Sequence, residues 1–333
     1  MRVDTAVLST PASRGIRLVA LGFLQDAHES GAGLEQSRDA DDLHDFRVAV
    51  RRLRSWMRAF DEELAGSVKK KDRRRLRDIA RATNLGRDID VQLEWLAEAS
   101  RGFRRKRRHG AEWLAEYLRA RQRHGEEDES AKLVESFEDV RTALVDQLST
   151  YQQRVEEPHA ERTLACAIAE RVMPHADDLL EKLADVHTIE DEADAHVARI
   201  AAKRLRYLIE PAAPSVKGGD DILSSLKSLQ DELGKLHDAH VMGHELTHAI
   251  EVAAATEAHR ASAEALGHGM ADAGEATLLL VAPRDGLLAL AKRLRSDVCD
   301  AFDHVRDTWL DGRASRFQRD LVTFTERLTA LHE

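Results

Sequence analysis

The strongest constraint on the fold of this chain is an amphipathic segment that begins at His44. At about 100° per residue in an α-helix, its basic and its apolar side chains separate onto opposite faces. The basic face carries His44, Arg47, Arg51 and Arg54, and the apolar face carries Phe46, Val50, Leu53, Met57 and Phe60. A segment of this kind predicts a helix that packs on a protein core with one side and presents cations on the other.

The same pattern returns 152 positions later, where His196 takes the place of His44. In both copies an arginine follows the histidine at +3, and further cations follow at +7, +8 and +10. In the second copy these residues are Arg199, Lys203, Arg204 and Arg206. The spacing predicts an internal duplication, with one motif helix in each half of the chain.

Two copies of H-x-x-R-x-x-x-[RK]-R-L-R in a helical chain resemble the signature of the CHAD family, the conserved histidine α-helical domain. The segment RDIDV, which begins at Arg87, is similar to the element that follows the first motif in that family. The resemblance covers nearly the whole chain, from about residue 10 to the C-terminus. It implies two helical bundles related by a pseudo-twofold axis, at residues 10–156 and 157–333. It also implies a basic surface that binds inorganic polyphosphate, and no catalysis.

The composition favours helices throughout the chain. Aromatic residues make up 5% of the 333 residues and prolines number 6, so strand formers and helix breakers are scarce. No segment alternates cleanly between apolar and polar residues, as a half-buried strand would. We therefore expect an all-α fold.

The chain shows no sequence sign of a membrane span or a secretory signal. It contains no apolar run of about 18 residues, and no apolar segment preceded by positive charges stands at its start. Cys166 and Cys299 lie far apart and belong to no CxxC pair, which is typical of free thiols in a reducing compartment. We therefore expect a cytoplasmic protein.

The basic residues are concentrated in the first half of a chain whose formal net charge is −10. Residues 1–155 carry 30 Lys and Arg against 27 Asp and Glu, so this part carries +3 and the remainder carries −13. Net charge governs solubility, whereas a ligand meets the local field. An acidic chain can therefore still bind an anion through a basic surface.

A second basic stripe follows the first motif. Lys70, Arg74, Arg77 and Arg81 are spaced to lie on one face of a helix, and Arg87 follows them. A further basic run covers residues 101–109. Like charges this close together repel unless an anion neutralises them, so the stripes predict an anion-binding surface rather than a merely solvated one.

A polymeric phosphate is the ligand that these rows of cations suit best. Helical spacing places successive donors about 5–6 Å apart, which fits a repeating linear anion better than a single phosphate. Arginine donates to phosphate in pairs, lysine adds a point charge, and histidine donates a hydrogen bond or adds charge when protonated. The predicted polyphosphate-binding residues are His44, Arg47, Arg51, Arg52, Arg54, Lys70, Arg74, Arg77, Arg81, Arg87, His196, Arg199, Lys203, Arg204 and Arg206.

Four of these residues have a second interpretation that the sequence leaves open. Arg52 and Arg204 lie about 100° around the helix from the basic row, so they could instead extend along packed aliphatic surface. His44 and His196 open the two motif helices and could instead hydrogen-bond acidic neighbours to orient the bundles.

Other functions lack the sequence features that they require. Nucleic-acid binding usually interleaves aromatic residues with cations, and Tyr207 alone lies beside the motif face. The chain has no P-loop, no GxGxxG motif and no GxSxG motif. We therefore expect no enzyme activity, no cofactor, no nucleic-acid partner and no membrane. The expected partner is polyphosphate, and the expected role is attachment to polyphosphate granules or assistance to a polyphosphate-metabolising enzyme.

One alternative comes from the pentapeptide HELTH at residues 244–248, which matches H-E-x-x-H. Two histidines one turn apart can hold zinc, with the glutamate as the general base of a metallopeptidase. Glu251 and Ala254 occupy the places where a zincin-type extension needs glycine and histidine, which argues against peptidase activity. A noncatalytic metal site remains as the alternative function. Its candidate ligands form a histidine stripe of His237, His240, His244 and His248.

Overall fold

The structure, a computed structural model, describes residues 3–37, 40–82, 85–123, 129–150, 162–266 and 283–332. These residues form helices joined by turns, and no strand occurs among them apart from an isolated antiparallel bridge between Pro11 and Thr163. The expected all-α fold is confirmed. Within the same ranges, no helix is both long and apolar enough to cross a membrane.

The chain folds into two compact units, each assembled from segments that are far apart in the sequence. Unit 1 comprises residues 1–84, 128–233 and 305–333, and unit 2 comprises residues 85–127 and 234–304. Each unit takes helices from both halves of the chain, and the division into bundles at residues 10–156 and 157–333 stays a prediction. The pseudo-twofold relation between the halves stays a prediction.

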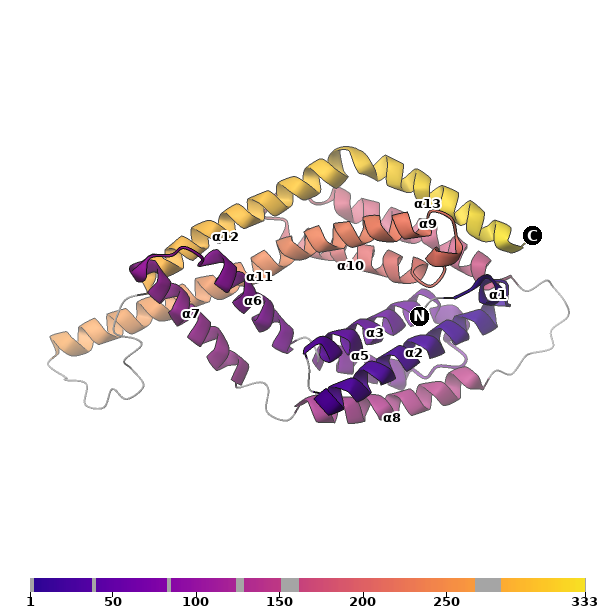
Figure 1. The fold of residues 1–333 in the computed structure, drawn as a ribbon, viewed down its shortest axis with the longest axis horizontal. Coiled ribbons are helices and arrows are strands. Elements are labelled where there is room, and N and C mark those ends of the chain that lie inside the picture. The colour runs from indigo at the N-terminus through magenta and orange to yellow at the C-terminus, as the bar shows by residue number, and fades with distance from the viewer. Residues whose placement is uncertain are drawn as a thin grey trace. The chain divides into compact units, whose positions relative to one another are not determined.

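Unit 1 contains both motif segments, in α3 (Ala40–Ala59) and α10 (Glu192–Ile209) (Figure 1). The two copies of the motif therefore belong to one packed body. The other elements of this unit are α1 (Thr5–Leu8), α2 (Ala12–Ser37), α4 (Asp61–Leu64), α5 (Lys70–Ala82), α8 (Glu129–Ser149), α9 (Leu164–Ala184), η1 (Ala213–Ser215), the first part of α11 (Gly219–Ala265), the π-helical η3 (Arg306–Arg313), α13 (Ala314–Thr329) and η4 (Ala330–His332).

Unit 2 contains α6 (Leu85–Ala99), α7 (Arg105–Arg123), the later part of α11 and nearly all of α12 (Arg284–Val305). Helices α6 and α7 pack against each other, and the turn that joins them contains Gly102 in the left-handed region, with φ of 80°. Trp95 Nε1 donates a hydrogen bond of 2.9 Å to Asp297 Oδ2, which ties α6 to α12.

The apolar face of α3 lies in the core of unit 1, as the sequence predicted. Helix α3 packs along α2, where Trp56 Nε1 donates a hydrogen bond of 2.9 Å to the Ile16 carbonyl oxygen. Each apolar side chain of this size contributes about 1.5–3 kcal/mol when it is fully buried. The buried face consists of Phe46, Val50, Leu53, Met57 and Phe60. Because this face holds α3 in place, the opposite face is left to carry charge.

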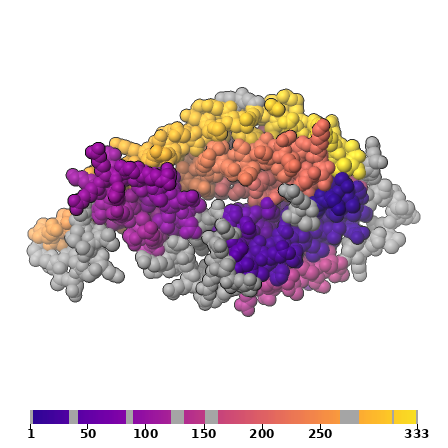
Figure 2. All heavy atoms as spheres, viewed as in Figure 1, coloured from indigo at the N-terminus to yellow at the C-terminus, as the bar shows by residue number. Residues whose placement is uncertain are grey.

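Helices α5 and α10 both contact α3 within unit 1. Leu76 and Ile79 of α5 are buried, and Asp72 at its start accepts a hydrogen bond of 2.9 Å from Gln147 on α8. The segment that contains α3 and α5 reaches the molecular surface (Figure 2). The three helices that carry most of the predicted basic residues therefore pack together.

Candidate anion-binding site

The basic row of α3 changes in exposure along the helix. His44, Arg51 and Arg54 are half-buried and Arg58 is exposed, whereas Arg47 is only 6% exposed. A guanidinium group buried this far offers little area to a ligand. The accessible arginines of the row are therefore Arg51, Arg54 and Arg58, whereas Arg47 is buried.

Arg54 lies where the charges of α3 and α5 meet. Its pKa is lowered from the ordinary arginine value, first by burial and then by the positive charges of Arg81, Arg77, Arg51 and Arg58. Arginine stays protonated at neutral pH, so all five charges persist and repel one another. These five guanidinium groups share one electrostatic environment, and we call them the α3–α5 arginine cluster.

The α3–α5 arginine cluster has almost no acid to neutralise it. Across the described ranges, four of its five guanidinium groups form no ion pair. The exception is Arg77, whose Nε lies 3.2 Å from Oδ1 of the adjacent Asp78. Like charges held one helical turn apart are destabilising. The cluster is therefore a site at which a bound anion would relieve repulsion.

Two other arginines of these helices are paired and serve the packing of unit 1. Arg52 makes a two-point ion pair with Glu210 at the C-terminal end of α10, with Nε 3.1 Å from Oε2. Arg73 pairs with Asp61, and burial lowers the pKa of Arg73. Arg52 thus links the two motif helices, which favours the structural interpretation of this residue.

Arg204, on the second motif helix α10, lies near Arg58 on the first motif helix α3. Burial lowers the pKa of Arg204, the charge of Arg58 lowers it further, and Asp178 opposes the shift. Arg204 therefore lies at the edge of the α3–α5 arginine cluster. Arg206 instead lies over the ring of Tyr207, with Cζ 4.9 Å from the ring centroid, in a cation–π contact.

His196 lies among cations of its own helix. Its pKa is lowered first by burial and then by Arg199 and Lys203, while Glu192 acts in the opposite direction. The neutral imidazole is therefore favoured in the free protein. An anion bound beside these residues would act against the two cations and raise the pKa of His196.

The outer members of the predicted rows fall in different parts of the structure. Lys70 and Arg74 are exposed on α5 in unit 1. Arg87 belongs to α6 in unit 2, and its side chain lies outside the described residues. The basic surface of unit 1 therefore continues along α5.

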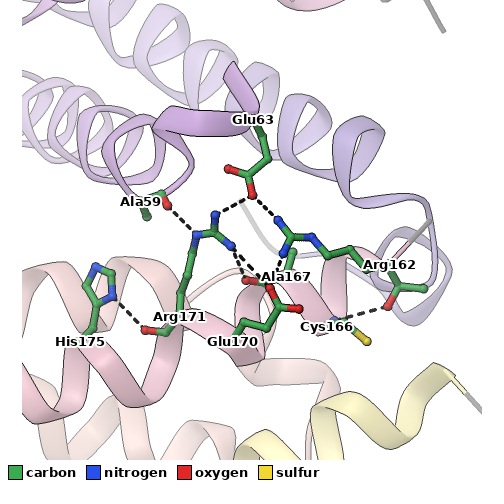
Figure 3. Close-up of polar contacts among 9 residues, drawn as sticks. Ala59, Glu63, Arg162, Cys166, Ala167, Glu170, Arg171 and His175 are labelled. Carbon is green, nitrogen blue, oxygen red and sulfur yellow. Dashed lines mark hydrogen bonds and ion pairs between the residues drawn. The ribbon is translucent and has the colours of Figure 1, made fainter. Parts of the chain in front are cut away.

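A partly buried ion network that the sequence did not predict holds the C-terminal end of α3. Arg171 of α9 donates hydrogen bonds to the Ala59 carbonyl oxygen at 2.7 Å and to Glu63 Oε1 at 2.5 Å. Its guanidinium carbon lies 4.6 Å from the centroid of the Phe60 ring. Figure 3 shows Glu63 between Arg171 and Arg162, which also pairs with it. This network links α9 to the turn beside Arg58, and no local sequence signal marks a pairing across about 100 residues.

The histidine stripe on α11 has packing contacts in unit 2. Glu245, the glutamate of H-E-x-x-H, forms an ion pair with Arg121 of α7. The His248 ring packs edge-on against Tyr117, with centroids 6.2 Å apart, and its Nδ1 lies 3.8 Å from Glu251. Among the described residues, which include all four histidines, no group of three or more His, Cys, Asp or Glu side chains could hold a metal ion. The described part of the chain therefore offers no set of ligands for the alternative metal site.

Comparisons with known proteins agree with the fold. A sequence profile of the CHAD domain matches residues 21–247. The crystal structure of the CHAD domain from the plant Ricinus communis matches with a TM-score of 0.58 and 18% identity, covering 97% of this chain and 94% of that chain. At this identity the likeness concerns the fold alone. No curated protein sequence matches the chain.

Proposed function

Because the chain belongs to the CHAD domain family, we propose that it binds inorganic polyphosphate through the basic surface of unit 1. The centre of the proposed site is the α3–α5 arginine cluster, and Arg204 lies at its edge. Lys70 and Arg74 continue the surface along α5. The proposed site thus takes residues from both motif helices, α3 and α10, and from α5.

The observation that carries the proposal is that, among the described residues, four of the five guanidinium groups of the α3–α5 arginine cluster form no ion pair. Nearby arginines that stabilise the fold, such as Arg52 and Arg171, each have a carboxylate. The cluster holds several positive charges close together, and these charges lower the pKa of Arg54 beyond the effect of its burial. A ligand with repeated negative charge would neutralise several of these groups at once.

The chemistry of the cluster suits a phosphate chain. Each guanidinium group can donate two hydrogen bonds to the oxygens of one phosphate, and cations one turn apart can engage successive phosphates. Neutralisation releases counterions, so the affinity should fall steeply with salt, with a log–log slope of roughly −0.7 per contact by analogy with single-stranded nucleic acid. Many weak contacts would make long chains bind more tightly than short ones.

The proposed role is noncatalytic. Binding would attach the protein to polyphosphate granules in the cytoplasm, or would present polyphosphate to an enzyme that acts on it. The chain has no P-loop or nucleophile elbow to suggest chemistry of its own. The proposal therefore requires only that the ligand be held and released.

The direct test is the affinity of the full chain for long-chain polyphosphate over a salt series, with single-stranded DNA of matched charge as competitor. The variant Arg51→Ala plus Arg54→Ala removes two cations from the centre of the cluster. A matched control, Arg316→Ala plus Arg319→Ala, removes two exposed cations from α13. We expect the first variant to lose most of the affinity and the control to retain it.

Two results would contradict the proposal. One is an affinity for polyphosphate that is equal in the cluster variant and the control. The other is displacement of polyphosphate by the DNA at equal charge, which would make the surface a general polyanion binder.

A further inference from the structure

A second basic surface lies in unit 2, at the start of α7. Residues 104–108 have the sequence RRKRR, and all five side chains are exposed. The first turn of α7 contains no acidic residue. Cations at a helix N-terminus oppose the helix dipole, because the free N–H groups there already carry partial positive charge. The sequence thus places five cations where a helix is least suited to hold them.

These cations have no carboxylate partner in the part of the chain that the structure describes. Other arginines of the same unit do have one, so unit 2 supplies carboxylates to arginines outside this group. Asp285 and Glu112 are exposed near the starts of α12 and α7, and neither forms an ion pair among the described residues. The paired arginines of unit 2 include Arg101 with Glu98, Arg119 with Glu116, Arg121 with Glu245, and Arg293 with Asp297.

The start of α12 meets the start of α7 at two glycines. A Cβ atom at Gly110 would lie 2.6 Å from the Gly286 Cα and 2.5 Å from the Pro283 carbonyl oxygen, so only glycine allows the two backbones to approach this closely. A Cβ atom at Gly286 would likewise lie 2.6 Å from the Gly110 Cα. The crossing brings the positive ends of two helix dipoles together, and it adds the exposed Arg284 to the cations of α7.

We propose that residues 104–108 and Arg284, which we call the α7 cation cluster, form a second polyphosphate-binding site of the protein. The inference rests on the proposed function for the class of ligand, and on the geometry of unit 2 for the site. A phosphate chain at this place would neutralise the exposed cations and the two helix ends together. The repulsion that the cluster carries in the free protein would then become binding energy.

Polyphosphate fits the cluster better than a nucleic acid does. Sequence-tolerant binding of single strands combines cations with exposed aromatic side chains on which the bases stack. Phe103 is half-buried and Trp113 is buried, so the described residues around the cluster present no exposed aromatic platform. A phosphate chain without bases needs only the cations.

The test compares polyphosphate binding by full-length variants over a salt series. The variant Arg104→Gln plus Arg105→Gln plus Arg108→Gln removes three charges from the α7 cation cluster. The control Arg313→Gln plus Arg316→Gln plus Arg319→Gln removes three exposed charges from η3 and α13. Both sets are also placed in the Arg51→Ala plus Arg54→Ala background.

We expect the α7 substitutions to weaken binding roughly tenfold at about 0.1 M salt and to make the log–log slope shallower by about 2, at roughly 0.7 per lost contact. In the Arg51→Ala plus Arg54→Ala background, they should remove the binding that remains. The control should do neither.

The outcomes separate the two proposals. If the α7 variant binds like its control, the second site is refuted and the proposed function stands. If the α7 substitutions abolish binding while Arg51→Ala plus Arg54→Ala leaves it intact, the second site stands and the proposed site in unit 1 is refuted. If single-stranded DNA of equal charge binds the α7 cluster as tightly as polyphosphate does, the assignment of the ligand is refuted. No binding of polyphosphate by the unaltered chain would refute both proposals.

Discussion

Replacing Arg54 by methionine should stabilise the free protein while weakening its binding of polyphosphate. Arg54 is half-buried, and its pKa is lowered first by this burial and then by the charges of Arg81, Arg77, Arg51 and Arg58. Each like-charged pair at such spacing is destabilising by about 0.2–0.5 kcal/mol, so removing one centre of four pairs should yield about 1 kcal/mol. Methionine keeps an unbranched apolar side chain, which limits the loss of packing. For a protein of this size, the unfolding temperature should rise by about 2 °C.

The assay is thermal unfolding at low and at high salt, with and without polyphosphate. High salt screens repulsion between partly exposed charges, so the gain from Arg54→Met should shrink as salt is added. Polyphosphate at about 100 times its dissociation constant should stabilise the unaltered protein by about 2.7 kcal/mol. The variant should gain less at the same polyphosphate concentration, because one of its phosphate contacts is gone.

The matched control is Arg52→Met, two positions away in sequence but on another face of α3. Arg52 is paired with Glu210, so its loss leaves a partly buried carboxylate without its cation and should cost about 1–3 kcal/mol. Opposite signs for the two substitutions would follow from the structure. A loss of stability in Arg54→Met as large as that in Arg52→Met would refute the idea that the cluster is held against repulsion.

Three further predictions follow from other parts of the structure. Because a bound anion should raise the lowered pKa of His196, affinity for polyphosphate should increase as pH falls from about 8 to 6, and His196→Asn should flatten this dependence in binding isotherms. Without a ligand, the free energy of unfolding should change in the opposite direction and decrease as pH falls below about 6.5. The reason is that His196 has a lower pKa in the folded protein, so protons bind the unfolded chain first. Glu63→Gln should lower the free energy of unfolding by about 2–4 kcal/mol, because it removes the carboxylate that Arg171 and Arg162 share, and an unchanged unfolding temperature would contradict this. Treatment with EDTA should leave the unfolding temperature unchanged, because Glu245 pairs with Arg121 and the described residues form no metal site.

The sequence predicted the helical class and the faces of the first motif helix correctly. Phe46 and Leu53 are buried, and Arg51 and Arg54 reach the surface, because a period of 3.6 residues assigns each side chain to one face whatever the helix packs on. The family was also recognisable from the doubled motif, and the profile match confirms it. These features depend on residues close together in the chain, so they can be inferred without the fold.

The predicted site was less complete, because neighbours in space decide what a cation does. Arg47 and Arg51 have the same periodicity, yet Arg47 is buried and Arg51 is half-buried. Arg52 has a partner 158 positions away in Glu210, which no local pattern announces. The histidine pattern around His244 suggested a metal site. A single helix can offer ligands from one face only, and the described residues of unit 2 add no further ligand to that face.

By itself, therefore, the sequence determined the helices, the two motif faces and the kind of charge that they carry, since these follow from short-range periodicity. Only the tertiary structure decided which basic rows meet. Packing of α5 on α3 assembles the α3–α5 arginine cluster, packing of α10 adds Arg204, and the glycine crossing of α7 and α12 assembles the α7 cation cluster. The physical reason is that repulsion between like charges depends on distance in space, and distance in space is set by the burial of apolar faces.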